Sequence, residues 1–177
     1  MNTANRIVIE SPFDRLFDLA ADVTRWPEFL PHYRWVRRLG SDLNVGPVSA
    51  PGRVVEMAAR HRGIPLWWQA EQRVRRDEKR IEFRHVAGIT KGMKVQWTFE
   101  DLTKGAERRT WLVQIHHQFE PRWLPVVGPW FAEQIVGKRF VQQVAGKTLA
   151  CLKKHVESLR PGPDADVEGS DPSLETV

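Results

Sequence analysis

Two histidines lie on the apolar sides of segments in which apolar and polar residues alternate. His85 shares its side with Phe83, and His117 shares its side with Ile115 and Phe119. A neutral imidazole in such a place can hydrogen-bond to a carbonyl or hydroxyl group of a ligand, and it can accept a proton as a general base. The alternative, which is the commoner case, is a structural histidine satisfied by its neighbours.

Four histidines raise the question of a metal site: His61, His85, His116 and His117. His116 and His117 are adjacent, so on a strand their side chains point to opposite faces. No carboxylate stands at a spacing that would complete a ligand set. We therefore expect no metal ion and no other cofactor.

The remaining reactive side chains point to structural roles. Asp22 falls at an expected helix end and Glu28 in a short exposed helix, so we expect capping or solvated roles for both. Cys151, the single cysteine, rules out an intramolecular disulfide framework and fits a small buried apolar residue in a reducing cytoplasm. No nucleophile elbow, phosphate-binding loop or dinucleotide fingerprint is present.

The N-terminal part predicts a strand followed by two short helices. Residues 6–10 form a β-branched run of strand type. Ser11 then fits an N-cap and Pro12 the first helical position. Pro27 and Pro31 limit the second helical piece to a few residues.

After Pro31 the pattern changes mostly to a period of two, which predicts six strands separated by short turns. Their expected bounds are Tyr33–Leu39, Arg53–Arg62, Pro65–Arg75, Arg80–Val86, Met93–Asp101 and Arg108–Phe119. Links this short indicate antiparallel neighbours. One face of the resulting sheet is apolar and must be covered.

From about Pro129 to Leu159 the apolar residues recur at helical spacing, which predicts a long helix over that face. Pro161 and Gly162 end the helix, and residues 161–177 are acidic and rich in Pro, Gly and Ser. We expect a disordered tail there and a single domain over residues 1–160. The expected class is α+β, an antiparallel sheet with helices on one face.

The composition is unusual in its aromatic residues. The 177 residues include eight Trp and eight Phe but one Tyr. Large rings offer contact area with little rotamer freedom to lose, so they suit an apolar ligand site as well as an ordinary core.

Charge and hydropathy bear on partners and location. The net charge is +5, and the acidic tail makes the rest of the chain more basic still. A basic body attracts anionic lipid, an acidic carrier protein or nucleic acid, but no nucleic-acid-binding motif occurs, so we expect no nucleic-acid partner. The first residues lack an apolar signal region and the apolar stretch 123–132 is too short to span a bilayer. We expect a cytoplasmic protein.

Three segments carry a family resemblance: residues 7–13, residues 22–31 and residues 84–99, together with the final helix. Over roughly residues 5–158 the chain resembles the START-like superfamily, also called SRPBCC or helix-grip. It is similar to the polyketide cyclase/dehydrase branch and to coenzyme-Q-binding START-type proteins. The resemblance implies a curved sheet of about seven strands around the long C-terminal helix, with a hydrophobic cavity between them.

The resemblance also implies a function and a set of site residues. We expect a carrier or chaperone that binds an apolar molecule such as a lipid, a quinone or a polyketide-like compound. The alternatives are a polyketide cyclase, aromatase or dehydratase acting on a carrier-bound substrate, and a non-enzymatic partner of a respiratory or carrier complex. The expected ligand-binding residues are Trp26, Tyr33, Met57, Phe83, His85, Met93, Trp97, Trp111, His117 and Phe140.

Arg73 is the best match to the arginine of aromatase/cyclase members that is thought to assist ring closure and dehydration. In the expected strand, however, Arg73 shares its side with Trp67 and Glu71, opposite the more apolar residues. It faces a cavity only if the polar side lines that cavity or a bulge shifts the register. A buried ion pair with Glu71 is the alternative to a catalytic cation.

The connection before the long helix, Trp123–Phe131, is apolar but contains prolines and a glycine. It fits a gate, a contact with a partner such as an acyl carrier protein, or shallow membrane contact. A buried loop that closes one end of the core is the alternative.

Overall fold

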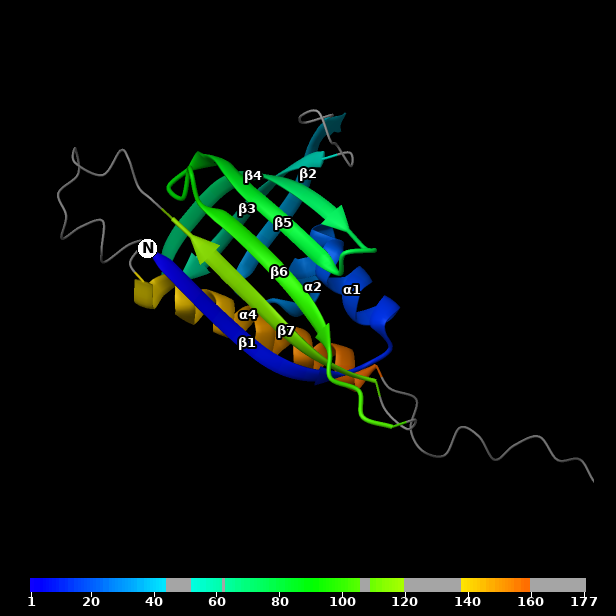
Figure 1. Ribbon diagram of the computed structural model, residues 1–177. Coiled ribbons are helices and arrows are strands. Elements are labelled where there is room, and N and C mark those ends of the chain that lie inside the picture. Colours follow the sequence, from blue (N-terminus) through cyan, green and yellow to red (C-terminus); the bar gives the residue numbers. More distant parts are fainter. Residues whose placement is uncertain (44–51, 62, 106–108, 120–137, 160–177) are drawn as a thin grey trace, which may run out of the picture.

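A computed structural model describes residues 1–43, 52–61, 63–105, 109–119 and 138–159 (Figure 1). It contains an antiparallel seven-stranded sheet in the order β1-β7-β6-β5-β4-β3-β2. The elements are β1 (Asn2–Glu10), α1 (Phe13–Ala21), the 3-10 helix η1 (Val23–Arg25), α2 (Trp26–Phe29), β2 (Tyr33–Leu43), β3 (Gly52–His61), β4 (Ile64–Arg75), β5 (Arg80–Gly88), β6 (Lys94–Asp101), β7 (Thr110–Gln118) and α4 (Lys138–Ser158). The expected α+β helix-grip fold is confirmed.

The long helix α4 lies along β1 on one side of the curved sheet (Figure 1). Asn5 Nδ2 donates to the carbonyl of Gln142 (3.1 Å) and Lys153 Nζ donates to the carbonyl of Val8 (2.8 Å). Because β1 is an edge strand, its backbone is open to pairing with another chain, and the contact of Lys153 covers one of its carbonyl groups. The helix therefore both closes the core and protects the edge.

The first helix begins one residue later than the sequence predicts. Pro12 occupies the N-cap position of α1, and no side chain caps the helix. Ser11 Oγ donates to the carbonyl of Pro12, while its backbone N–H bonds to the carbonyl of Arg109 and extends the sheet. The expected N-cap role of Ser11 is thus wrong, because this residue still belongs to the strand pairing.

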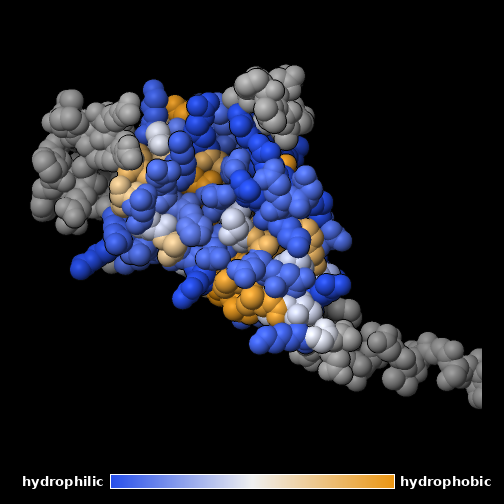
Figure 2. Space-filling view, viewed as in Figure 1, coloured by the Kyte–Doolittle hydropathy of each residue, from blue (hydrophilic) through white to orange (hydrophobic). Residues whose placement is uncertain are grey.

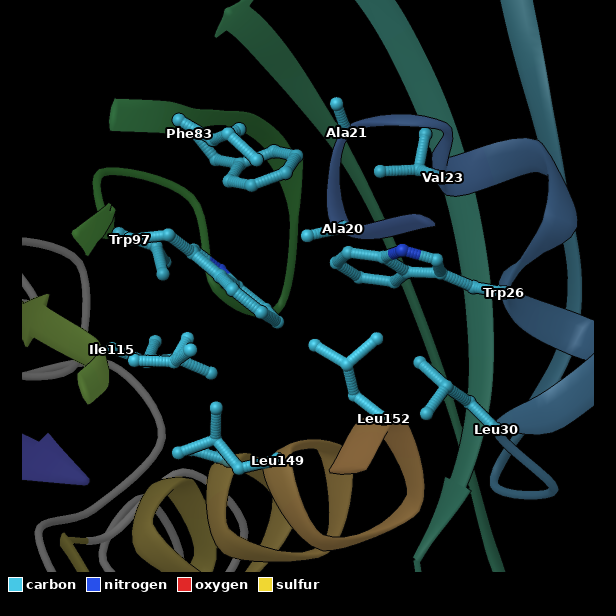
Figure 3. Close-up of a cluster of buried hydrophobic side chains, with 14 of the residues drawn as sticks. Ala20, Ala21, Val23, Trp26, Leu30, Phe83, Trp97, Ile115, Leu149 and Leu152 are labelled. Atoms are coloured by element: carbon cyan, nitrogen blue, oxygen red, sulfur yellow. The ribbon is translucent and has the colours of Figure 1, made fainter. Parts of the chain in front are cut away.

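The apolar face of the sheet meets α1 and α4 in one continuous core. In β6 and β7 the buried residues alternate as expected, with Trp97 and Ile115 facing inward. On α4 the buried positions include Leu149 and Leu152, which Figure 3 shows facing the sheet. Packing of this stripe on the sheet, rather than helix propensity alone, fixes the position of α4.

Three predicted features fall outside the described residues. They are the acidic tail 161–177, the connection Trp123–Phe131 and the first residues of the expected long helix before Lys138. Among the helices that the structure describes, none has the length and apolar character needed to cross a membrane.

Candidate functional site

A cavity of about 90 Å³ lies between the N-terminal half of α4 and one end of the sheet. Its walls come from all strands except β1, from α2 and the turn after it, from the turn between β5 and β6, and from α4. Arg60, which is exposed, lines it as well, so one side reaches the surface. The volume suits one small ring or the end of a chain, since a single water needs roughly 10–15 Å³ on the same kind of measure.

Nine of the ten expected ligand-binding residues line this cavity: Trp26, Tyr33, Met57, Phe83, His85, Met93, Trp97, His117 and Phe140. Their aromatic members pack on one another around Trp26. Its ring centroid lies 5.1 Å from that of Tyr33 and 5.6 Å from that of Trp97, and its Nε1 donates to the carbonyl of Leu19 (3.3 Å). Figure 3 shows Trp26, Phe83 and Trp97 turned toward one another above the leucines of α4.

Trp111 lies elsewhere. Its ring packs against Phe13 at 4.7 Å, and its Nε1 donates to the carbonyl of Ser11 (3.1 Å). Trp111 and His117 share a face of β7, but their separation along the chain corresponds to about 20 Å of strand. Trp111 is therefore a core residue at the opposite end of the sheet, and its expected place at the ligand site was wrong.

Arg73 lies on the outer face of the sheet, away from the cavity. It pairs in register with Glu82 on β5 and lines a surface groove with Glu71 and Arg84. Arg84 binds the Glu71 carboxylate through two nitrogens at 2.9 Å. The strand keeps its alternation at this position, with Gln72 buried and Arg73 half-buried. Arg73 therefore faces outward, as the alternation indicated, and not into the cavity as the catalytic role implied by the family resemblance would require.

The outer face of the sheet has the character of a solvated surface. Figure 2 shows it as mostly hydrophilic, with some hydrophobic residues gathered over β1 and β7. Val8 on β1, which is 41% exposed, pairs there with Leu112 on β7. The surface groove beside Arg73 is also lined by Phe83, Val95 and His117, three residues that line the cavity from the other side.

On one wall of the cavity the hydroxyl of Thr148 lies next to the polar groups of His32 and Tyr33. Thr148 Oγ1 donates to the carbonyl of Val144 (2.9 Å) and lies 2.9 Å from His32 Nε2. Tyr33 also hydrogen-bonds to Thr148, and burial nevertheless raises the pKa of the Tyr33 phenol far above its usual range. Because the Thr148 proton is used on Val144, the hydroxyl accepts from His32 Nε2–H.

On the other wall His85 and His117 lie close enough to influence each other electrostatically. His85 Nδ1 is 2.6 Å from Thr90 Oγ1 in the β5–β6 turn. Burial lowers the pKa of His85 to about 3, and His117 adds to this. Burial lowers the pKa of His117 to about 4, with a smaller effect of His116. Both imidazoles are therefore neutral near pH 7.

The site also contains residues that the sequence analysis did not select. Trp68 is 7% exposed, stacks on His85 at 5.8 Å and lines the cavity, yet its Nε1 has no hydrogen-bond partner among the described residues. The alternation of β4 could have indicated its direction. His32 and Thr90 lie in turns, where no period marks them. Thr148 lies at helical spacing among the buried residues of α4, where nothing distinguishes it as a site residue.

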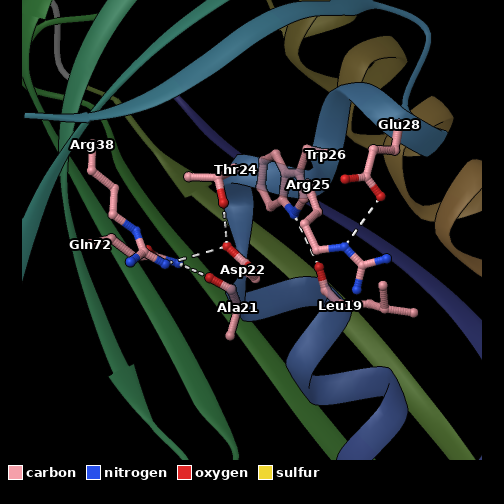
Figure 4. A network of polar contacts seen from close by, with 9 residues as sticks. All are labelled: Leu19, Ala21, Asp22, Thr24, Arg25, Trp26, Glu28, Arg38 and Gln72. Carbon is pink, nitrogen blue, oxygen red and sulfur yellow. Dashed lines mark hydrogen bonds and ion pairs between the residues drawn. The ribbon is translucent and has the colours of Figure 1, made fainter.

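Asp22 and Glu28 do not form a carboxylate pair. Asp22 Oδ1 accepts from Thr24 Oγ1 (2.6 Å) and lies 3.4 Å from Arg38, while Glu28 binds Arg25 (Figure 4). Within the described part of the chain, no three His, Cys, Asp or Glu side chains gather as a metal site would require.

Acidification is expected to destabilise the fold through the two cavity histidines. In the unfolded chain a histidine takes up a proton near pH 6.5, whereas His85 and His117 stay neutral in the fold down to about pH 3 and 4. The unfolded state therefore binds more protons between these limits, and stability falls as the pH falls. Each histidine should cost about 2 kcal/mol between pH 7 and pH 5.

Urea unfolding at pH 7 and pH 5 measures this loss. The variant His85→Phe should lose about half of the pH dependence, whatever its stability at pH 7. The same drop in His85→Phe as in the unchanged chain would contradict the assignment. Depressed carboxyl pKa values, such as that of Glu56, act only at lower pH and do not interfere.

A family model described as polyketide cyclase / dehydrase and lipid transport matches residues 9–144. No curated protein matches the sequence.

Solved structures match more widely. The Zhui aromatase/cyclase from Streptomyces sp. R1128 has a TM-score of 0.69 at 15% identity, over 89% of this chain and 93% of that one. The protein TTHA0849 from Thermus thermophilus has a TM-score of 0.66 at 13% identity, over 91% of this chain and all (100%) of that one. The di-domain ARO/CYC BexL from the BE-7585A pathway has a TM-score of 0.63 at 21% identity, and the match covers 89% of this chain but 46% of that one. At such identities the likeness shows the fold alone.

Proposed function

Because the chain belongs to the polyketide cyclase / dehydrase and lipid transport family, we propose that it binds an apolar small molecule in the cavity under α4, as a carrier or chaperone. The observation that carries this proposal is the lining itself. Buried aromatic and aliphatic side chains surround a void and a few neutral polar groups. Binding would be driven by burial of the ligand's apolar surface, worth ~25 cal/mol per Å².

The volume limits what enters without rearrangement. Drug-sized ligands occupy pockets of roughly 300–1,000 Å³, well above the 90 Å³ present here. A quinone ring or the end of a longer chain fits first, and a larger guest must displace wall residues. Met57 and Met93 are suited to this because methionine side chains are unbranched and adaptable.

The test is the content of the purified protein. Native mass spectrometry of freshly purified material should show a bound apolar compound, and organic extraction should release it. Protein that carries nothing and does not respond to any added apolar compound would reject the proposal.

Filling the cavity should abolish binding. Ala145 on α4 is buried and lines the cavity, so Ala145→Leu places three additional carbon atoms in the void. We expect toluene to raise the melting temperature of the unchanged chain, and its affinity for Ala145→Leu to be at least tenfold lower. Thermal unfolding with increasing toluene measures both.

The matched control is Ala150→Leu, an exposed position on the same helix, which should bind toluene normally. If Ala145→Leu proves too unstable, the half-buried lining residue Val144 offers Val144→Phe as a second filling variant. Normal toluene binding by a folded filled variant would place the ligand elsewhere.

A second candidate function is a cyclase or dehydratase that acts on a carrier-bound substrate. The favouring observation is that His117 Nδ1 has no hydrogen-bond partner in the described part of the chain and belongs to a neutral imidazole. It would accept a proton, and the Tyr33 phenol would supply one. Loss of water from a poly-β-keto thioester, abolished by His117→Gln, would establish this activity.

A further inference from the structure

We propose that the cavity selects an uncharged ligand whose buried end carries an oxygen that accepts a hydrogen bond from Trp68 Nε1–H, and that it rejects carboxylates at that end. This inference rests on the proposed function and specifies its ligand. It follows from the hydrogen bonds within the wall and from the charges that surround the void.

The first step is that Trp68 offers a donor with no internal use. An indole N–H can only donate, and Trp68 Nε1 is buried with no acceptor among the described residues. A buried donor left without a partner costs free energy. Because Nε1 has almost no accessible surface in this structure, a ligand oxygen reaches it only when a neighbouring wall residue gives way. The oxygen then removes that cost, whereas an apolar ligand leaves it in place.

The second step is that Trp68 is held in position. Its ring stacks on His85, with centroids 5.8 Å apart and planes at 10°, and it meets Tyr33 edge-on at 6.0 Å. Both neighbours are themselves fixed by hydrogen bonds, His85 to Thr90 and Tyr33 to Thr148. The donor is therefore ordered before the ligand arrives, which reduces the entropic cost of binding.

The third step is that other polar groups of the wall are already paired. His85 Nδ1 lies against Thr90, and the Thr148 hydroxyl makes three hydrogen bonds. His117 Nδ1 is another buried atom of a lining residue without a partner in the described chain. It can bind a further hydroxyl or carbonyl of the guest, according to its tautomer.

The fourth step concerns charge. Of the cationic side chains that the structure describes, only Arg60 lines the cavity, and it is exposed. His85 and His117 are neutral at pH 7. A carboxylate at the inner end would lose its hydration without gaining a counter-ion, which weakens its binding. Ring ketones, quinone carbonyls, phenols and amides fit, while an ionised group fits only at Arg60.

Three compounds of nearly equal shape test this: cyclohexanone, methylcyclohexane and cyclohexanecarboxylate. NMR of the full chain labelled with ¹⁵N resolves the indole N–H signals, and Trp68→Phe assigns that of Trp68. We expect cyclohexanone to shift the Trp68 signal in the direction of stronger hydrogen bonding. Cyclohexanecarboxylate should bind at least tenfold more weakly than cyclohexanone.

The variant Trp68→Phe should weaken cyclohexanone binding about tenfold and leave methylcyclohexane binding nearly unchanged. The matched control is Trp67→Phe, since Trp67 is 42% exposed on the outer face and donates to Glu56 at 3.0 Å. It should bind all three compounds normally. If Trp68→Phe does not fold, the Trp68 signal is assigned in the unchanged chain from its through-space contacts with His85 and Tyr33, and its shift decides.

The two proposals fail differently. Equal binding of the ketone and the hydrocarbon, or no response of the Trp68 signal to the ketone, would overturn this inference while the cavity keeps its proposed function. Binding of the carboxylate as tight as that of the ketone would do the same. Failure of all three compounds to bind would overturn both.

Discussion

Replacing Trp97 with alanine is expected to lower the free energy of unfolding by about 3–5 kcal/mol. Trp97 is buried on β6, and its ring packs 5.6 Å from that of Trp26 beside the cavity. The loss combines the transfer free energy of the indole with the cost of the space it leaves, because the surrounding sheet and helix relax only in part. Urea unfolding at pH 7 measures it.

The control is Trp35→Ala, on the outer face of β2. Trp35 is 37% exposed and is covered by Arg37, whose Cζ lies 4.8 Å from the ring centroid. We expect a loss below about 1 kcal/mol. Added indole should restore part of the stability of Trp97→Ala and none in Trp35→Ala. Similar losses in both variants would mean that the aromatic cluster is not what holds this end of the core together.

The fold could be predicted from the sequence because its elements have different periods. Six strands after Pro31 and the helix before Pro161 were expected, and the observed bounds agree closely where the structure describes both. The differences are at the ends. Ser11 stays in the strand pairing because its backbone N–H finds the carbonyl of Arg109, a contact between residues far apart in the sequence.

The sequence predicted which face of each strand points toward the site, but not where along the strand the site lies. Alternation shows which side chains face the core, so His117 and Trp111 were treated alike. The structure brings His117 to the cavity and leaves Trp111 with Phe13 at the other end of β7. Family resemblance pointed to Arg73 although alternation opposed it, and on this residue the physical argument was the better guide.

The residues that escaped prediction owe their place to tertiary contacts. His32 meets Thr148 across 116 positions of sequence. The helical period places Thr148 on the buried side of α4, but no local pattern indicates its contact with His32. For Trp68, the alternation of β4 indicates that the side chain faces the core. Whether its indole N–H finds an acceptor, however, depends on the residues that surround the ring in the fold. Hydrogen-bond satisfaction is a property of the assembled wall, and no local pattern encodes it.

The arrangement separates charge from the ligand site. The ion pairs of Arg25, Arg38 and Arg84 lie on exposed surfaces, while the inner polar groups of the cavity are neutral hydroxyl, phenol, imidazole and indole groups. Neutral groups in a low dielectric bind polar atoms without the desolvation cost of an ion. The β5–β6 turn, which carries Thr90, is one of the parts that hold this wall in place.

Replacing Gly88, the last residue of β5 before that turn, with alanine is expected to cost about 3 kcal/mol or more. Gly88 has a φ of +84°, and a Cβ there would lie 2.3 Å from the carbonyl oxygen of Trp67 and 2.7 Å from the Cα of Trp68. Both atoms belong to the backbone of β4, so no side chain can move aside. The ends of β4 and β5 must therefore separate, and Trp68 and Thr90 must move with them.

Gly92, in the same turn, is the matched control, with a φ of +92° and open space where its Cβ would lie. Gly92→Ala should cost only the backbone term, about 1 kcal/mol. Its N–H keeps the bond to the carbonyl of His85. Gly88→Ala should also lose cyclohexanone binding at least tenfold under conditions where it remains folded, because Trp68 is displaced. Melting temperatures and cyclohexanone binding curves of the two variants test this prediction. Equal effects of Gly88→Ala and Gly92→Ala would show that backbone conformation, and not the close approach of β5 to β4, shapes this wall.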